Sequence, residues 1–173
     1  MKHLRLALTA LAFAAVASPV FAQSREVTRA GIQRTNLVSS NPIGLLFQWY
    51  NGEFEHAFSP AASFAVAGTR FDFDNINYTA IDGIVRYYPG ARAIRGFSVG
   101  ASAGFISIND DCFLCDNQDE SAFTLGVRGD YVWLLGRDQR FAAAAGIGAK
   151  RLIGNNYGND GLPIGRLSIG WAF

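Results

Sequence analysis

The fold is decided by the stretch LSIGWAF at positions 167–173, in which large apolar residues alternate with small ones. A β-strand places successive side chains on opposite faces, so this alternation predicts a strand with one apolar face. The pattern extends back to Pro163, which gives about ten residues, enough for a tilted strand to cross a bilayer. The large side chains are Leu167, Ile169, Trp171 and Phe173. The pattern favours a membrane strand, although a soluble domain can also end in a half-buried strand.

The other end of the chain has the features of an export signal. A positive start at Lys2, His3 and Arg5 precedes an apolar run from Leu6 to Val16, and residues 20–22 suit a signal peptidase. A retained anchor is disfavoured, because the run is too short to span a bilayer as a helix. The predicted segments are a signal peptide over residues 1–22 and a polar lead-in over 23–30, with the mature chain starting at Gln23.

The composition excludes some functions and permits a membrane barrel. Without Lys2 and Arg5, 13 basic residues face 14 acidic ones, so no basic stripe is available for nucleic acid. Half of the residues are hydrophobic and the mean hydropathy is +0.13, with no second stretch long enough for a transmembrane helix. A transmembrane barrel gives such averages because each strand is apolar on one face only.

Six segments show the period of two that strands require. They span residues 62–74, 78–88, 96–108, 122–135, 141–152 and 162–173. The chain from Gly31 to Phe58 has room for two more strands, with candidate turns at 41–44 and at 51–52 that leave the first reversal open. We therefore predict an all-β fold: an eight-stranded antiparallel up-and-down transmembrane β-barrel over residues 31–173.

The connections between these segments alternate in length. Short or turn-like ones at 59–61, 89–95 and 136–139 lie on the side of both ends of the barrel. Those at 75–76, 109–120 and 154–161 lie opposite, and the last two are long. Outer-membrane barrels have short turns in the periplasm and longer loops outside. We therefore expect both ends of the barrel to face the periplasm.

The alternation assigns four acids and four bases to the face opposite the apolar one. They are Glu53, Glu55, Asp82, Asp130, Arg86, Arg128, Lys150 and Arg166. The interior of an eight-stranded barrel is only wide enough for side chains to fill. We predict a network of salt bridges that closes the lumen to solutes. Its expected hubs are Arg86 and Arg128, because a guanidinium can bridge two carboxylates.

Over residues 31–173 the chain resembles the small eight-stranded outer-membrane proteins of the OmpA-barrel and OmpX type. The final strand is similar to the last strand of such barrels, whose terminal Phe belongs to a signal read by the barrel-assembly machinery. More narrowly, NPIGLLF at 41–47, EFE at 53–55 and RYYP at 86–89 are similar to motifs of an uncharacterised family of exported barrel proteins, whose middle motif is E-Y-E. The resemblance implies the fold and an outer-membrane location, and no known chemistry.

Cys112 and Cys115 lie in the longest loop, among five acidic residues. A redox-active pair needs a lowered thiol pKa, which acidic surroundings oppose. Zinc would need about two further ligands of the same kind, and none is nearby. We therefore predict a disulfide formed after export, and no metal site. The acids could gather a divalent cation, but solvated loop charge is the favoured interpretation.

Catalysis is the alternative from another functional class, because lipid-modifying barrel enzymes exist. His56 is the only histidine after residue 22, and Ser59 follows three residues later, so the alternation puts them on opposite faces or across a turn. Glu53 and Glu55 share one face, but the inward arginines favour salt bridges over paired catalytic acids. We therefore predict no catalytic residue and no cofactor.

Together these observations predict a non-enzymatic outer-membrane protein with a structural or surface-exposed role in the cell envelope. The expected partners are outer-membrane lipid, lipopolysaccharide and, during biogenesis, the barrel-assembly machinery, and the expected state is a monomer. The alternative is a lipocalin-like periplasmic barrel that binds a ligand, which would direct its apolar side chains inward. A lipid-modifying enzyme would need a second catalytic group near His56.

Overall fold

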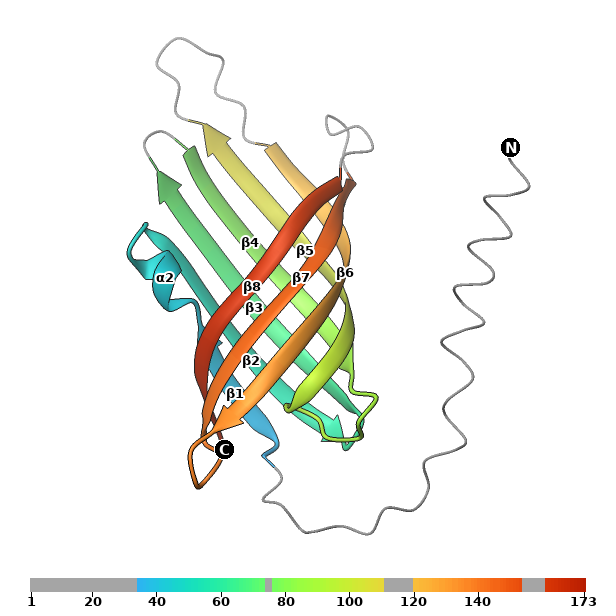
Figure 1. Ribbon diagram of the computed structural model, residues 1–173. Helices are drawn as coiled ribbons and strands as arrows, with labels where there is room; N and C mark the ends of the chain where they lie inside the picture. Colours follow the sequence, from blue (N-terminus) through green and yellow to red (C-terminus); the bar gives the residue numbers. More distant parts are fainter. Residues whose placement is uncertain (1–33, 74–75, 111–119, 154–160) are drawn as a thin grey trace, which may run out of the picture. The chain divides into compact units, whose positions relative to one another are not determined.

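In a computed structural model of the protein, eight strands close into a barrel and pair with their neighbours in chain order (Figure 1). The structure describes residues 34–73, 76–110, 120–153 and 161–173. The barrel belongs to one compact unit, Ile32–Phe173. All strand pairs are antiparallel. The predicted up-and-down barrel is confirmed.

The strand ends agree closely with the segments expected from the alternation. The elements are β1 (Asn36–Ser40), α2 (Pro42–Leu45), β2 (Trp49–Ser59), β3 (Ala62–Phe73), β4 (Ile76–Tyr87), β5 (Gly96–Asp110), β6 (Glu120–Leu135), β7 (Phe141–Ile153) and β8 (Gly161–Ala172). The six segments correspond to β3 through β8. Among the described residues, no helix is long and apolar enough to cross a membrane.

The first reversal of the chain takes place through α2, between β1 and β2. Asn41 caps this helix because its side-chain oxygen accepts hydrogen bonds from the backbone N–H groups of Ile43 and Gly44, at 3.0 and 3.1 Å. Pro42 occupies the first helical turn, where it lacks only an N–H that would have no helical partner. The alternative turn at 51–52 is therefore wrong, because Asn51 and Gly52 lie inside β2.

The barrel closes where β1 meets β8, next to the end of the chain. Four residue pairs join the two strands, from Leu37 with Ala172 to Ser40 with Ile169. Beyond β8, the backbone of Phe173 exchanges two 2.9 Å hydrogen bonds with Asn36. We call this the terminal end of the barrel, and the end that carries α2 the far end.

The alternation separates the two faces of the wall. Inward residues such as Glu55, Ser63 and Arg86 are fully buried, whereas outward neighbours such as Phe54, Phe64 and Tyr87 are about half exposed. The wall thus places its large apolar side chains outside and its charged side chains inside, which is the arrangement expected of a small membrane barrel.

An apolar base fills the terminal end of the lumen. The segment between β4 and β5 folds inward, and its backbone is held by hydrogen bonds from Tyr88 N to Ala61 O and from Ala93 N to Pro60 O, both 2.7 Å. Ile94 is completely buried and has a φ of +65°, a value that is costly for a β-branched residue. The base consists of Leu37, Ala57, Tyr88, Ala93, Ile94, Val132, Ala142, Ala144 and Ala172.

Candidate functional site: the lumenal charge network

The centre of the lumen is occupied by Arg86, whose side chain has no exposed surface. Its Nη1 donates to Glu55 at 2.8 Å, its Nη2 to Glu53 at 3.1 Å and its Nε to Asp130 at 3.2 Å. One guanidinium therefore bridges carboxylates from two other strands, β2 and β6. Such an arrangement offsets the cost of burying a charge only when every partner is in place.

Glu55 is tied to the wall by two hydroxyl groups as well as by Arg86. Its Oε1 accepts hydrogen bonds from Ser63 Oγ and Tyr88 OH, each 2.5 Å long. Burial, and then the neighbouring Glu55 carboxylate, raise the pKa of the Tyr88 phenol above its ordinary value. Tyr88 therefore stays protonated and donates, and it connects the charged centre to the apolar base.

Two further arginines complete the centre of the network. Arg166 Nη2 donates to Glu53 at 2.6 Å, and its Nη1 lies 4.0 Å from Asp130. Arg128 pairs with Asp130 alone among the described residues, through Nη2 at 3.0 Å. The expectation that Arg128 would be the second hub is wrong, because Arg166 is the residue that lies between two carboxylates.

Nearer the far end, Lys150 and Asp82 form a separate pair at 2.5 Å. The side chains of Lys150 and Asp82 are 12% and 10% exposed, whereas those of Arg86 and Glu55 are fully buried. The eight charged residues expected in the lumen thus all lie there, and each has a hydrogen-bonded partner of opposite charge. Two arginines, Arg86 and Arg166, share Glu53.

Inward glycines make room for these side chains, and the structure shows which glycine lies opposite which charge. Gly146 lies opposite Asp130, and a Cβ at this position would overlap the Asp130 carboxylate. Gly104 stands in the same relation to Asp82. Each lumenal charge on β4, β6 and β7 has a glycine across from it, namely Gly100, Gly104, Gly126, Gly146 or Gly148. In the sequence, a glycine at an inward position therefore indicates a large charged side chain opposite it on the neighbouring strand.

The remaining predicted residues lie away from this network. The stripe Leu167, Ile169, Trp171 and Phe173 faces outward, with each side chain about half exposed. His56 also points outward, and its Nδ1 lies 2.8 Å from the Asn36 side-chain oxygen. Ser59 Oγ accepts a hydrogen bond from Ala61 N and contributes no partner to His56. Cys112 and Cys115 lie outside the described residues.

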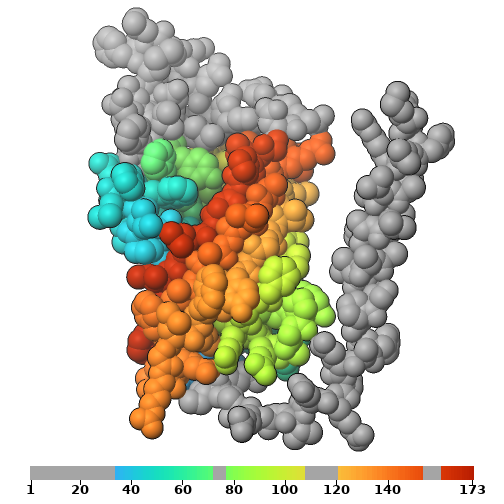
Figure 2. Space-filling view, in the orientation of Figure 1, coloured from blue at the N-terminus to red at the C-terminus, as the bar shows by residue number. Residues whose placement is uncertain are grey.

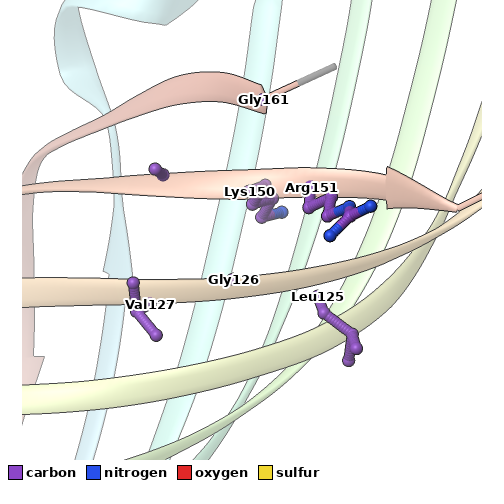
Figure 3. A pocket seen from close by; sticks show the side chains of 7 residues that line it. Leu125, Gly126, Val127, Lys150, Arg151 and Gly161 are labelled. Carbon is purple, nitrogen blue, oxygen red and sulfur yellow. The ribbon is translucent and has the colours of Figure 1, made fainter. Parts of the chain in front are cut away.

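The far end of the lumen contains a cavity of about 380 Å³ beside the charged network. Its wall includes Arg128, Lys150 and Arg166, together with Trp49 and Leu162. A second, shallow depression lies on the outer wall between β6 and β7, where Leu125 and Val127 stand beside Arg151 (Figure 3). Within the part of the chain that the structure describes, no three His, Cys, Asp or Glu side chains gather to hold a metal ion.

A comparison with solved structures gives the fold. The chain matches the crystal structure of the N-terminal β-barrel domain of Pseudomonas aeruginosa OprF with a TM-score of 0.51 and 16% sequence identity, covering 82% of this chain and 98% of that domain. This similarity shows the barrel fold. No protein-family model matches the chain, and no curated protein matches it.

Proposed function

We propose that this chain is a bacterial outer-membrane β-barrel protein with a structural or surface-exposed role in the envelope and no catalytic activity. The observation that carries the proposal is the inverted distribution of side chains. Apolar residues cover the outer wall, and charges fill the lumen. In water the outer wall would be an exposed apolar patch far larger than soluble monomers tolerate.

The outer wall has the composition that a bilayer requires. At the terminal end, Tyr131 and Trp133 lie 4.7 Å apart between ring centroids, and Arg140 lies 6.0 Å from the Trp171 ring. Toward the far end, Phe105 and Phe123 form an edge-to-face pair at 5.3 Å. Aromatic residues at both edges of an apolar band are typical of membrane barrels.

The direction of the side chains also argues against the alternative functions. A lipocalin-like carrier needs an apolar lumen, whereas Arg86, Glu53, Glu55 and Asp130 occupy the centre of this one. A lipid-modifying enzyme needs a base paired with a nucleophile, whereas the partner of His56 is the Asn36 amide.

The same proposal assigns orientation and partners. The terminal end faces the periplasm and the far end faces outward, as expected from the lengths of the connections. Exposed cations on the far half of the outer wall, Arg70 and Arg151, suit the phosphates of outer-membrane lipid and lipopolysaccharide. The outward stripe of β8 suits recognition by the barrel-assembly machinery. We further propose that the signal peptide is cleaved after residue 22, that Cys112 and Cys115 form a disulfide, and that the barrel is a monomer.

Fractionation of cells tests the location. The protein should sediment with outer membranes, require detergent for extraction, and migrate differently on a gel with and without heating, because a closed barrel resists unfolding by detergent. A heat-insensitive protein released by osmotic shock would contradict the proposal and favour the periplasmic carrier.

A further inference from the structure

The barrel wall is incomplete on one side of its far half. β1 has 5 residues, whereas its neighbours β2 and β8 have 11 and 12. β8 pairs with β1 only from Ile169 to Ala172, and β2 pairs with β1 only up to Gly52. In the described part of the chain, residues 161–168 of β8 and 49–51 of β2 therefore face no strand on this side.

Local features keep this side from closing. α2 takes the place of a longer β1 and lies close to β2, where a Cβ at Gly44 would be only 2.7 Å from the Trp49 carbonyl oxygen. Ser40 Oγ donates to the Asn51 carbonyl at 2.6 Å and so satisfies part of the edge of β2. Pro163 lies in the unpaired stretch of β8 and has no N–H to offer another strand. Unpaired backbone N–H and C=O groups at a strand edge are costly in hydrocarbon, so this edge must border an occupied or polar space.

The cavity of about 380 Å³ lies behind this edge. Its wall combines residues 162–167 of β8, Asn41 beside α2, and Trp49 and Asn51 of β2 with the lumenal charges. Figure 2 shows the segment around α2, in cyan, next to the far half of β8, in red. The volume falls within the range of small-molecule sites. The cavity therefore borders both the charged lumen and the unpaired edges of β8 and β2.

Two kinds of surface line the cavity. The charged part consists of Arg128, Lys150, Arg166, Glu53 and Asp82, and together with Arg86, Glu55 and Asp130 behind it the network is electrically neutral. Within the described residues, Arg166 Nη1 is buried without a hydrogen-bond acceptor. The apolar part lies toward the opening and includes Leu162, Leu167 and the edge-to-face pair of Trp49 and Phe71, whose ring centroids are 6.2 Å apart. A buried donor without an acceptor is costly, so the site is suited to an anion.

We propose that this opening is a lateral binding site for a long-chain fatty-acid anion taken from the surrounding membrane. The carboxylate accepts a hydrogen bond from Arg166 Nη1, which has no hydrogen-bond acceptor among the described residues, because a guanidinium matches a carboxylate. The hydrocarbon chain leaves between β8 and β2, past Trp49, into the bilayer. The inference goes beyond the proposed envelope role and rests on it only for the position of the barrel in a membrane.

Quenching of Trp49 fluorescence tests the site. Trp133→Phe and Trp171→Phe leave Trp49 as the single tryptophan of the mature protein, which is placed in nanodiscs of phosphatidylcholine. The probe is 9,10-dibromostearate, and the matched uncharged probe is 9,10-dibromostearyl alcohol. We expect saturable quenching by the acid, with half-saturation at about tenfold lower concentration than for the alcohol, as one charge-assisted hydrogen bond provides. Equal quenching by both probes, or quenching by the acid that never saturates, would overturn the proposal.

Two variants test whether the stronger quenching by the acid depends on contact between its carboxylate and Arg166. Arg166→Gln should abolish the difference between acid and alcohol, whereas Arg137→Gln, in the exposed turn between β6 and β7, should preserve it. Heat-dependent gel migration establishes that each variant is folded, and the acid and alcohol comparison on the unaltered network remains decisive if Arg166→Gln does not fold. An unchanged difference in folded Arg166→Gln would contradict the assignment. Failure of the location would instead appear as a protein that does not enter nanodiscs.

Discussion

The two ends of the lumen differ although the same strands build both. At the terminal end, all strands are paired on both sides, the apolar base is closed, and Arg86 contacts three carboxylates with no exposed surface. At the far end, β1 has ended, a cavity of about 380 Å³ remains, and Lys150 has one carboxylate partner and residual exposure. Complete strand pairing thus accompanies dense packing of buried charge, whereas the shortened β1 accompanies an unfilled cavity.

The largest expected effect concerns the buried centre. Arg86→Met should lower the free energy of unfolding by about 3 to 5 kcal/mol, because it leaves Glu53, Glu55 and Asp130 buried beside one another without their shared cation. Urea unfolding in lipid vesicles, followed by tryptophan fluorescence, measures the change.

Lys150→Met is the matched control from the far end. Its cost should be smaller, about 1 to 3 kcal/mol, because only one buried carboxylate, Asp82, loses its partner. Similar losses for the two variants would remove the energetic distinction between the ends of the lumen.

A substitution in the apolar base should lower the free energy of unfolding by less than Arg86→Met does. Ile94→Ala should cost about 2 to 4 kcal/mol, because it leaves a cavity among Tyr88, Val132 and Leu37. The loss should fall short of that for Arg86→Met, since Ala at a φ of +65° is less strained than a β-branched residue. The same urea titration applies, with Ile153→Ala on the outer wall as the lipid-facing control. A neutral Ile94→Ala would show that the base does not pack as described.

The smallest expected effect distinguishes a crowded inward glycine from a glycine with open space around it. Gly146→Ala should cost about 1 to 3 kcal/mol, because the added methyl group displaces the Asp130 carboxylate. Gly165→Ala on β8, where nothing lies within 4 Å of an added Cβ, should be neutral or slightly stabilising. Unfolding midpoints of the two variants in the same vesicles decide the matter, and equal midpoints would contradict the role given to Gly146.

Much of the wall follows from the sequence because a strand has a strict period of two. Once Leu167 and Ile169 are placed outside, Arg166 and Ser168 must face inward, and the same rule brings all eight lumenal charges inside. Tyr88 shares the face of Arg86 two residues earlier, so its position could also have been predicted. The Asn-Pro pair at 41–42 is a helix start as well as a turn signal, and α2 shows that the helix prevails.

The partners within the network could not be predicted in this way. Arg86 reaches Glu55 from β4 to β2 and Asp130 from β4 to β6, across strands that do not pair. Such contacts depend on the stagger of the closed barrel, which no single strand encodes. For the same reason Arg166, rather than Arg128, lies between two carboxylates, and the incomplete side depends on the residue at which β1 ends.

The central claim is that the terminal half of the lumen is a solid plug of ion pairs and apolar side chains. Planar-bilayer recordings of the purified protein test it most directly, because ions cross only if a continuous aqueous path exists. We expect no stable conductance, because the fully buried network around Arg86 and the apolar base close the lumen between the cavity and the terminal end. Steady ion-conducting steps from the unaltered protein would contradict it.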